Sequence, residues 1–378
     1  MLKWKLVYLI NSLGAGGAER HLLNLASEMV RRGHLVWVVS LEKQIRGGAD
    51  SLELSFVEAG VNVIYLSSFF LGDAGRWLSL VSLLRRLLPD IIHSHLPRSD
   101  LAASIAKAIS PNMFWVSTIH DAHTKDTYSG HWIFPFVRWN WRRADHFVMV
   151  SKHVQEWGVQ ALALSSDKTR VIYHGVPLYE VPDSLHQKTT SSMLIGCLAR
   201  FEKRKGIETL VRAMVEVRKA FPEALLLLAG NDPTGYSYVI KKLAKALNVE
   251  NNVKVLGFCS TQLEFLHSLD VFAFASSSEG FGIVLIEAMS LKRPVVASNI
   301  YPINYIVQHG KTGLLVNPED HLAFAEAIVA LLGNPERGRE MGEAGYQRSV
   351  EEFSLERSLN KVHDLYIELT KNALPKND

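Results

Sequence analysis

The stretch that most constrains the fold is residues 271–291, where a short apolar run is followed by a glycine loop and an apolar helix. Residues 271–275 are Val-Phe-Ala-Phe-Ala, which is typical of a buried strand. The loop that follows contains three serines and two glycines, and a helical pattern begins near Gly282. A strand that turns directly into a helix presents unpaired backbone N–H groups at the helix N-terminus, and these bind anions. The sequence therefore predicts an α/β fold with a phosphate-type site at this loop.

Two acidic residues flank that predicted site. Glu279 lies in the loop, and Glu287 lies in a helix whose other residues are almost all apolar, so we expect Glu287 to be buried. A buried carboxylate needs hydrogen-bond partners, and two ribose hydroxyls would serve. The spacing of the two acidic residues also allows a purely structural role for both. Glu279 could cap the helix while Glu287 makes an internal salt bridge.

A second strand, glycine loop and helix open the chain. Residues 6–10 are apolar, a loop contains Gly14, Gly16 and Gly17, and a helix is expected over residues 18–32. A dinucleotide-binding loop would need a third glycine or alanine where Glu19 stands, so the pattern argues against that fold. A plain turn, with Glu19 favouring the positive end of its helix, is the alternative.

Histidines gather where two further strands are expected to end. His93 and His95 close one apolar run, and His120, Asp121 and His123 follow another. Ligands bind at the carboxyl edge of such sheets. Imidazole and carboxylate groups could ligate a metal there, but polar residues at loop edges are common, and we do not expect a metal.

Bulk properties limit the class of protein. A chain of 378 residues is long enough for two domains, and a net charge of +3 does not suggest nucleic-acid binding. Its two cysteines suit a reducing compartment, and no apolar run is long enough for a membrane span or a signal peptide. A cytoplasmic protein is therefore expected. A polar stretch at residues 179–192 predicts the interdomain linker.

A basic loop follows the first strand of the second half. It contains Arg200, Lys203, Arg204 and Lys205. A charge run of this kind is usually a solvated surface. At the carboxyl edge of a strand it also suits the binding of a diphosphate, and the context favours that role.

Glu279-Gly280-Phe281-Gly282, with a second acidic residue at Glu287, resembles the signature of the retaining, GT-B-fold glycosyltransferases of family 4. The resemblance extends over most of the chain. It implies two Rossmann-like, doubly wound α/β domains facing a cleft, with an acceptor domain over residues 1–178 and a donor domain over residues 193–354. It also implies that a terminal helix, within residues 355–378, crosses back onto the first domain.

The resemblance assigns roles residue by residue. It implies that Glu279 contacts the donor sugar, that Glu287 holds the ribose, and that Arg200 and Lys205 neutralise the donor diphosphate. It implies that His120 contacts the transferred sugar. Its remaining donor-site positions are Gly16 and Gly17 beside the phosphate and acceptor, the main chain at Gly280, Phe281, Gly282, Ile283 and Val284 on the diphosphate, and Phe258 near the base. The chain departs from the family at His174, where an asparagine is usual, and at Tyr305, where an acidic residue is usual.

The implied reaction transfers a hexose or N-acetylhexosamine from a UDP- or GDP-sugar to a hydroxyl of a saccharide or lipid-linked glycan, with retention. No protein-bound metal or cofactor is expected, and the sequence contains no Asp-x-Asp. A GT-B sugar-nucleotide epimerase and a catalytically silent nucleotide-sugar-binding protein are the alternatives. Residues 132–143 mix aromatic and arginine side chains, which suits a peripheral contact at the inner face of a membrane. A helix packed against the first sheet is favoured over that contact.

Overall fold

The computed structural model describes residues 3–14, 16–42, 51–66, 73–122, 139–178 and 193–371. The chain divides into two compact units. Unit 1 comprises Met1–His174 with Ser358–Asp378, and unit 2 comprises Gly175–Arg357. The predicted linker at residues 179–192 lies outside the described residues.

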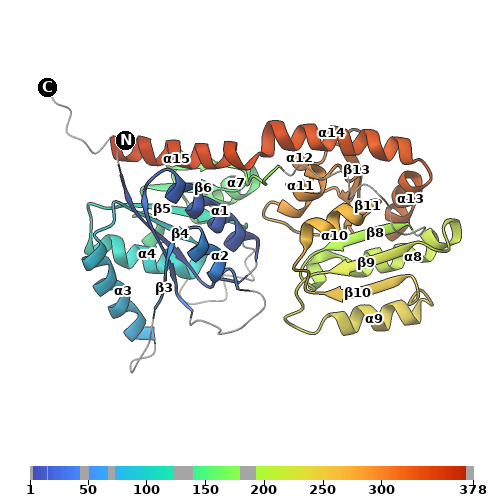
Figure 1. The fold of residues 1–378 in the computed structure, drawn as a ribbon, viewed down its shortest axis with the longest axis horizontal. Helices are drawn as coiled ribbons and strands as arrows, with labels where there is room; N and C mark the ends of the chain where they lie inside the picture. Colours follow the sequence, from blue (N-terminus) through green and yellow to red (C-terminus); the bar gives the residue numbers. More distant parts are fainter. Residues whose placement is uncertain are drawn as a thin grey trace. The chain divides into compact units, whose positions relative to one another are not determined.

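Unit 1 is a parallel sheet in the order β3-β2-β1-β4-β5-β6-β7, with helices packed on it (Figure 1). Its central strands are buried on both faces because helical connections cover both sides of a parallel sheet. The described strands are β1 (Lys5–Ile10), β2 (Leu35–Ser40), β3 (Asn62–Tyr65), β4 (Ile91–His95), β5 (Phe114–Ile119), β6 (His146–Met149) and β7 (Thr169–Val171). The described helices are α1 (Gly17–Arg31), α2 (Glu53–Glu58), α3 (Asp73–Leu87), α4 (Pro97–Ile109), α7 (Lys152–Leu162) and α15 (Leu355–Lys371).

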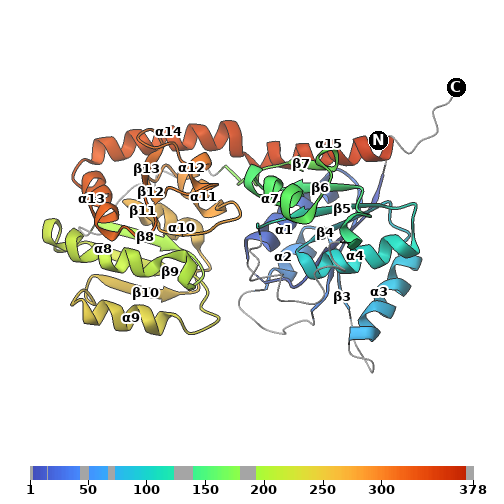
Figure 2. The same ribbon diagram turned by 180° about the vertical axis from the view of Figure 1, so that it is seen from behind.

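The last helix, α15, completes unit 1 although it comes from the other end of the chain. Its buried residues include Leu359, Val362, Leu365 and Tyr366, which form one stripe at helical spacing. Figure 2 shows α15 running along this unit beside α7 and β6. The presence of this helix and its packing in unit 1 are both as the resemblance implied.

Unit 2 is a second parallel sheet, in the order β10-β9-β8-β11-β12-β13. Its core is built from apolar strands such as β11, in which every residue is buried. The strands are β8 (Leu194–Leu198), β9 (Leu225–Ala229), β10 (Val253–Gly257), β11 (Val271–Phe274), β12 (Val295–Ser298) and β13 (Gly313–Val316). The helices are α8 (Ile207–Ala220), α9 (Ser237–Ala246), α10 (Gln262–Ser268), α11 (Ile283–Ser290), α12 (Ile303–Ile306), α13 (His321–Leu332) and α14 (Pro335–Phe353).

Candidate functional site

In unit 2, two loops meet at the point where the strand order reverses. The chain builds outward from β8 to β10 and then returns to place β11 on the other side of β8. Ligands of open α/β sheets bind beside the carboxyl ends of the strands at such a switch point. The loop after β8 carries Arg200 and Lys205, and the loop after β11 carries Glu279. The topology thus brings together three predicted site residues that are up to 79 positions apart in sequence.

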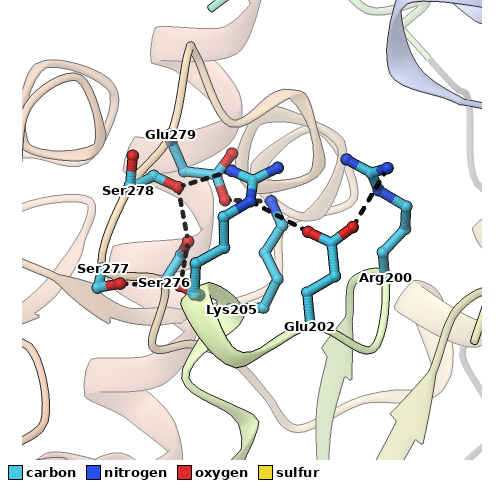
Figure 3. A network of polar contacts seen from close by, with 8 residues as sticks. Arg200, Glu202, Lys205, Ser276, Ser277, Ser278 and Glu279 are labelled. Carbon is cyan, nitrogen blue, oxygen red and sulfur yellow. Dashed lines mark hydrogen bonds and ion pairs between the residues drawn. The ribbon is translucent and has the colours of Figure 1, made fainter. Parts of the chain in front are cut away.

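Hydrogen bonds to backbone carbonyls hold the two loops together (Figure 3). The Ser277 N–H donates to the Arg204 carbonyl over 2.8 Å, and the hydroxyls of Ser276 and Ser277 donate to the same carbonyl over 3.1 Å. In return, Arg204 Nη1 donates to the Ser278 carbonyl over 3.1 Å. Gly206 has a φ of +64°, and a side chain there would collide with the backbone of the neighbouring loop. The loops are therefore a preorganised pair.

Lys205 and Glu279 form an ion pair at the centre of this arrangement. Lys205 Nζ lies 2.5 Å from Glu279 Oε1, and the two side chains are only 11% and 9% exposed. The ammonium also lies 5.6 Å from the centre of the Phe274 ring. Glu279 does not cap α11, because the N-cap is Gly282, with a φ of 101° and no side-chain cap hydrogen bond. The capping alternative is therefore wrong.

Arg200 lies at the outer edge of the same network. Its guanidinium contacts Glu202 at 3.2 Å and is 56% exposed, and Glu202 also accepts from Arg204 Nε over 3.0 Å (Figure 3). A guanidinium that is exposed but fixed by one carboxylate keeps donors available for a second anion. Arg200 is therefore placed to meet a ligand that enters from solvent.

The first turn of α11 shows where backbone and side chain have separate roles. Phe281 is buried, and its ring packs edge-on against Phe353 at 6.0 Å, so only its main chain could contact a ligand. Gly280 and Gly282 are also buried. Because Gly282 supplies no capping side chain, the first amides of α11 have no side-chain cap.

The expectation that Glu287 is buried is wrong, since the structure places it in a half-buried position. Ile283, Val284 and Glu287 are the half-buried residues of α11, and spacings of four and three place them on one face of the helix. One face of α11 is therefore partly exposed to solvent, and Glu287 lies on that face. The apolar composition of the helix does not show this. This removes the burial cost that pointed to the ribose, so the ribose assignment rests on the resemblance alone.

Two other predicted positions of unit 2 are resolved. Phe258 follows β10 and is 37% exposed. It lies at the same edge of the sheet, two strands away from β8. Tyr305, which departs from the family pattern, donates to Glu352 Oε2 over 3.3 Å, and its carbonyl accepts from Arg348. Tyr305 is therefore engaged within unit 2 itself.

In unit 1 the switch point lies between β1 and β4. The predicted Gly16–Gly17 loop follows β1, and Gly16 is the N-cap of α1 with no side-chain cap hydrogen bond. A side chain at Gly16 would collide with the carboxylate of Glu19. Glu19 thus lies at the positive end of its own helix, as the plain-turn alternative predicts. An anion at this loop would have to displace it.

Beside that loop, unit 1 holds a cluster of histidines. His95 Nδ1 lies 3.0 Å from His120 Nε2. The ring of His174 stacks on that of His120 with ring centres 5.3 Å apart. Its ring centre also lies 4.2 Å from that of His21. The sequence pattern predicted His93, His95 and His120 at one edge, whereas His174 stood out only as a departure from the family pattern. His21 was not predicted there, because it lies in α1 and no local signal marks it.

The buried members of this cluster are neutral at pH 7. Burial lowers the pKa of His21 to about 4 and that of His93 to about 3, and it lowers the pKa values of His95 and His174 as well. Within the described part of the chain, no group of three or more His, Cys, Asp or Glu side chains could hold a metal ion. His123 lies outside the described residues.

Comparisons with known proteins match both halves of the chain to glycosyltransferases. A family model described as "Glycosyl transferases group 1" matches residues 184–348, and one described as "Glycosyltransferase Family 4" matches residues 15–180. The chain belongs to glycosyltransferase family 4. N-acetyl-alpha-D-glucosaminyl L-malate synthase of Bacillus anthracis is 24% identical over 366 residues, which cover 94% of this chain and 95% of that protein. A GDP-mannose-dependent alpha-(1-6)-phosphatidylinositol monomannoside mannosyltransferase of Mycobacterium tuberculosis is 37% identical over 160 residues, covering 40% of this chain and 41% of that one.

Solved structures extend this family 4 assignment to the fold. The crystal structure of Anabaena Alr3699/HepE in complex with UDP and glucose matches with a TM-score of 0.86 at 22% identity, covering 97% of this chain and all of that one. The fold is GT-B, as the resemblance implied. Among the described residues, no helix combines the length and apolar character needed to cross a bilayer. Most of the aromatic and arginine segment, residues 132–138, lies outside that part.

Proposed function

We propose that this family 4 member is a retaining, metal-independent glycosyltransferase that uses a nucleoside diphosphate sugar. The observation that carries the proposal is the partly buried Lys205–Glu279 pair, which lies beside the N-terminus of α11 at the switch point of unit 2. A cation, a carboxylate and uncapped helix amides in one place suit a ligand that is anionic at one end and a polyol at the other.

The diphosphate is assigned to the positive part of this site. The first-turn amides of α11 and the Lys205 ammonium bind its oxygens, and Arg200 approaches from solvent. As the bond to the sugar breaks, negative charge grows on the leaving diphosphate. Fixed donors at that position stabilise the transition state more than the ground state, and loss of one such donor typically costs ~10²–10³ in rate.

Glu279 exchanges partners in this scheme. When phosphate oxygens reach Lys205, they compete with the carboxylate for the ammonium, and Glu279 becomes available to accept hydrogen bonds from sugar hydroxyls. The bond between the anomeric carbon and the diphosphate oxygen breaks while a bond to the acceptor oxygen forms on the same face. The acceptor proton passes to the leaving phosphate, so no side chain of the protein is needed as a base.

Sugar donors with either uracil or guanine as the base are consistent with the relatives of this chain. Anabaena Alr3699/HepE was solved with UDP and glucose, and the Mycobacterium tuberculosis relative is described as GDP-mannose-dependent. We assign the sugar to the hexoses or N-acetylhexosamines and the acceptor to a saccharide or lipid-linked glycan. The proposed location is the cytoplasm.

The test supplies UDP-glucose, UDP-N-acetylglucosamine and GDP-mannose separately, with and without a saccharide acceptor, and measures free nucleoside diphosphate. A transferase releases it faster with acceptor, and EDTA leaves the rate unchanged. An epimerase converts the donor without acceptor, and a silent binding protein releases nothing. The anomeric configuration of the product, read by proton NMR, decides whether the reaction retains it.

A further inference from the structure

Arg348, on α14, fixes the end of α12 with its guanidinium group. Nε donates to the Ile306 carbonyl over 2.9 Å, and Nη2 donates to the Tyr305 carbonyl over 2.6 Å. These carbonyls end α12, where the helix itself supplies no partner for them. Nη1 lies 2.5 Å from Glu352 Oε1, and the Arg348 side chain is only 11% exposed. Because all three nitrogens have an acceptor, the guanidinium is held in one orientation.

The same guanidinium lies over two aromatic rings. Its central carbon is 5.3 Å from the centre of the Phe353 ring and 5.6 Å from that of the Tyr305 ring. The two rings pack edge to face with their centres 6.1 Å apart. The attraction between a cation and an aromatic ring is stronger when the charge is withdrawn from water. Arg348 therefore holds the Phe353 ring as well as the end of α12.

Both groups that Arg348 holds lie against the glycine loop before α11. The Phe353 ring packs edge-on against Phe281, with ring centres 6.0 Å apart. Ile306 Cδ1 would lie 3.8 Å from a Cβ added at Gly282, so this side chain packs against the backbone there. Phe281 and Gly282 directly precede the first residue of α11. Their positions therefore set the direction in which the first amides of that helix point.

We propose that Arg348 is a positioning residue for the amides at the N-terminus of α11. It acts through Phe353 and Ile306 rather than by contact with the ligand, and all of these contacts lie within unit 2. The identity of the ligand, a diphosphate bound by those amides, rests on the proposed function. Hydrogen bonds weaken steeply as the donor turns away from its acceptor, so a loosened loop loses affinity for the diphosphate first.

The first test examines the loop without a ligand. Hydrogen exchange is followed by mass spectrometry in the wild type and in Arg348→Met, which keeps an unbranched side chain but removes the charge and every N–H donor. Exchange over residues 279–286 should become roughly 10-fold faster, which is the size expected when the hydrogen bonds of a charged group are lost. The rest of unit 2 should exchange at its wild-type rate.

Arg293→Met is the matched control. Arg293 is also half-buried in unit 2, and it also donates to two backbone carbonyls, that of Leu291 over 2.9 Å and that of Leu269 over 3.0 Å. It lies just before β12, at the amino edge of the sheet, whereas the glycine loop lies at the carboxyl edge. Its loss should leave exchange over residues 279–286 unchanged.

The second test compares a nucleoside diphosphate with its nucleoside, using UDP and uridine or GDP and guanosine, whichever pair the wild type binds. Calorimetry gives the affinity for the diphosphate, and ligand-detected NMR gives that for the nucleoside. Arg348→Met should weaken diphosphate binding roughly 10-fold and leave nucleoside binding unchanged, because only the diphosphate reaches the amides of α11. Arg348→Lys keeps the charge and can reach one carbonyl, so it should recover part of the affinity.

An unchanged exchange rate over residues 279–286 in Arg348→Met would overturn the positioning role, and so would an equal rise in Arg293→Met. Equal losses of diphosphate and nucleoside affinity would also overturn it, since the defect would then not concern the amides. If exchange rises only in Arg348→Met but the wild type binds no nucleoside diphosphate, the loop is positioned as inferred and the proposed function fails. Arg348→Lys takes the place of Arg348→Met in both tests if the latter does not fold.

Discussion

Lowering the pH from 7 to 5 should weaken unit 1 selectively. His21 and His93 are 6% and 1% exposed, and burial lowers their pKa values from 6.5 to about 4 and about 3. Above pH 6.5 they are neutral in both the folded and unfolded states. As the pH falls below 6.5 the unfolded chain takes up protons that the folded chain cannot. Stability is therefore lost from pH 6.5 down to the folded pKa.

The magnitude follows from the linkage slope of about 1.36 kcal/mol per pH unit for one proton. At pH 5, each of the two histidines lowers the free energy of unfolding by about 2 kcal/mol. Asp100 opposes them, because burial raises its pKa to about 6 and protonation then favours the folded state by about 1 kcal/mol. The net loss from these three groups is about 3 kcal/mol, and His95 and His174 add to it. A loss of that size is a large fraction of the stability of a typical domain.

Tryptophan fluorescence during urea unfolding is the appropriate assay. All eight tryptophans of the chain lie within Met1–His174, so their signal reports unit 1 alone. The urea midpoint should fall markedly between pH 7 and pH 5. The variant His21→Phe should lose about 2 kcal/mol of that pH dependence, whatever its stability at pH 7. An equal pH dependence in His21→Phe and wild type would refute the reasoning.

The remaining predictions concern unit 2. Arg200→Ala should lower turnover ~10²–10³-fold while its melting temperature stays near that of the wild type, since the side chain is 56% exposed. The control is Lys203→Ala, which changes an exposed residue of the same loop. Equal losses of turnover in both variants would count against the role of Arg200. Glu287→Gln should weaken nucleoside diphosphate binding by calorimetry, and unchanged affinity for both UDP and GDP would remove it from the ribose. Gly206→Ala should destabilise unit 2 by more than about 1 kcal/mol in urea titrations, because φ is +64° and the added Cβ meets the backbone of residue 275. An unchanged stability would mean that the loops after β8 and β11 can separate freely.

The fold was predictable because local patterns carry it. Apolar runs followed by glycine loops and helices predicted strands over residues 6–10 and 271–275, and the structure has β1 at Lys5–Ile10 and β11 at Val271–Phe274. The resemblance supplied the return of the last helix. Helix ends were predicted to within one residue at the first glycine loop, where the helix expected over residues 18–32 is α1 at Gly17–Arg31.

The candidate sites were only partly predictable, because their contacts depend on strand order. Nothing local in the sequence links Lys205 to Glu279, which lie 74 residues apart and meet because β11 pairs with β8. The burial of Glu287 was misjudged since composition does not show which face of a helix stays open. His21 joins the histidine cluster through the packing of α1, which no spacing rule could show.

The return of α15 has a consequence for how the polypeptide is made. Residues of unit 1 leave the ribosome first, but the buried hydroxyl that bonds His93 belongs to Tyr366, near the end of the chain. Unit 2 is continuous from Gly175 to Arg357 and so is synthesised in full before its predecessor has all its parts. During translation the usual order, in which the leading domain finishes first, is therefore reversed. A nascent chain arrested just before Ser358 would carry a finished second half and an unfinished first half.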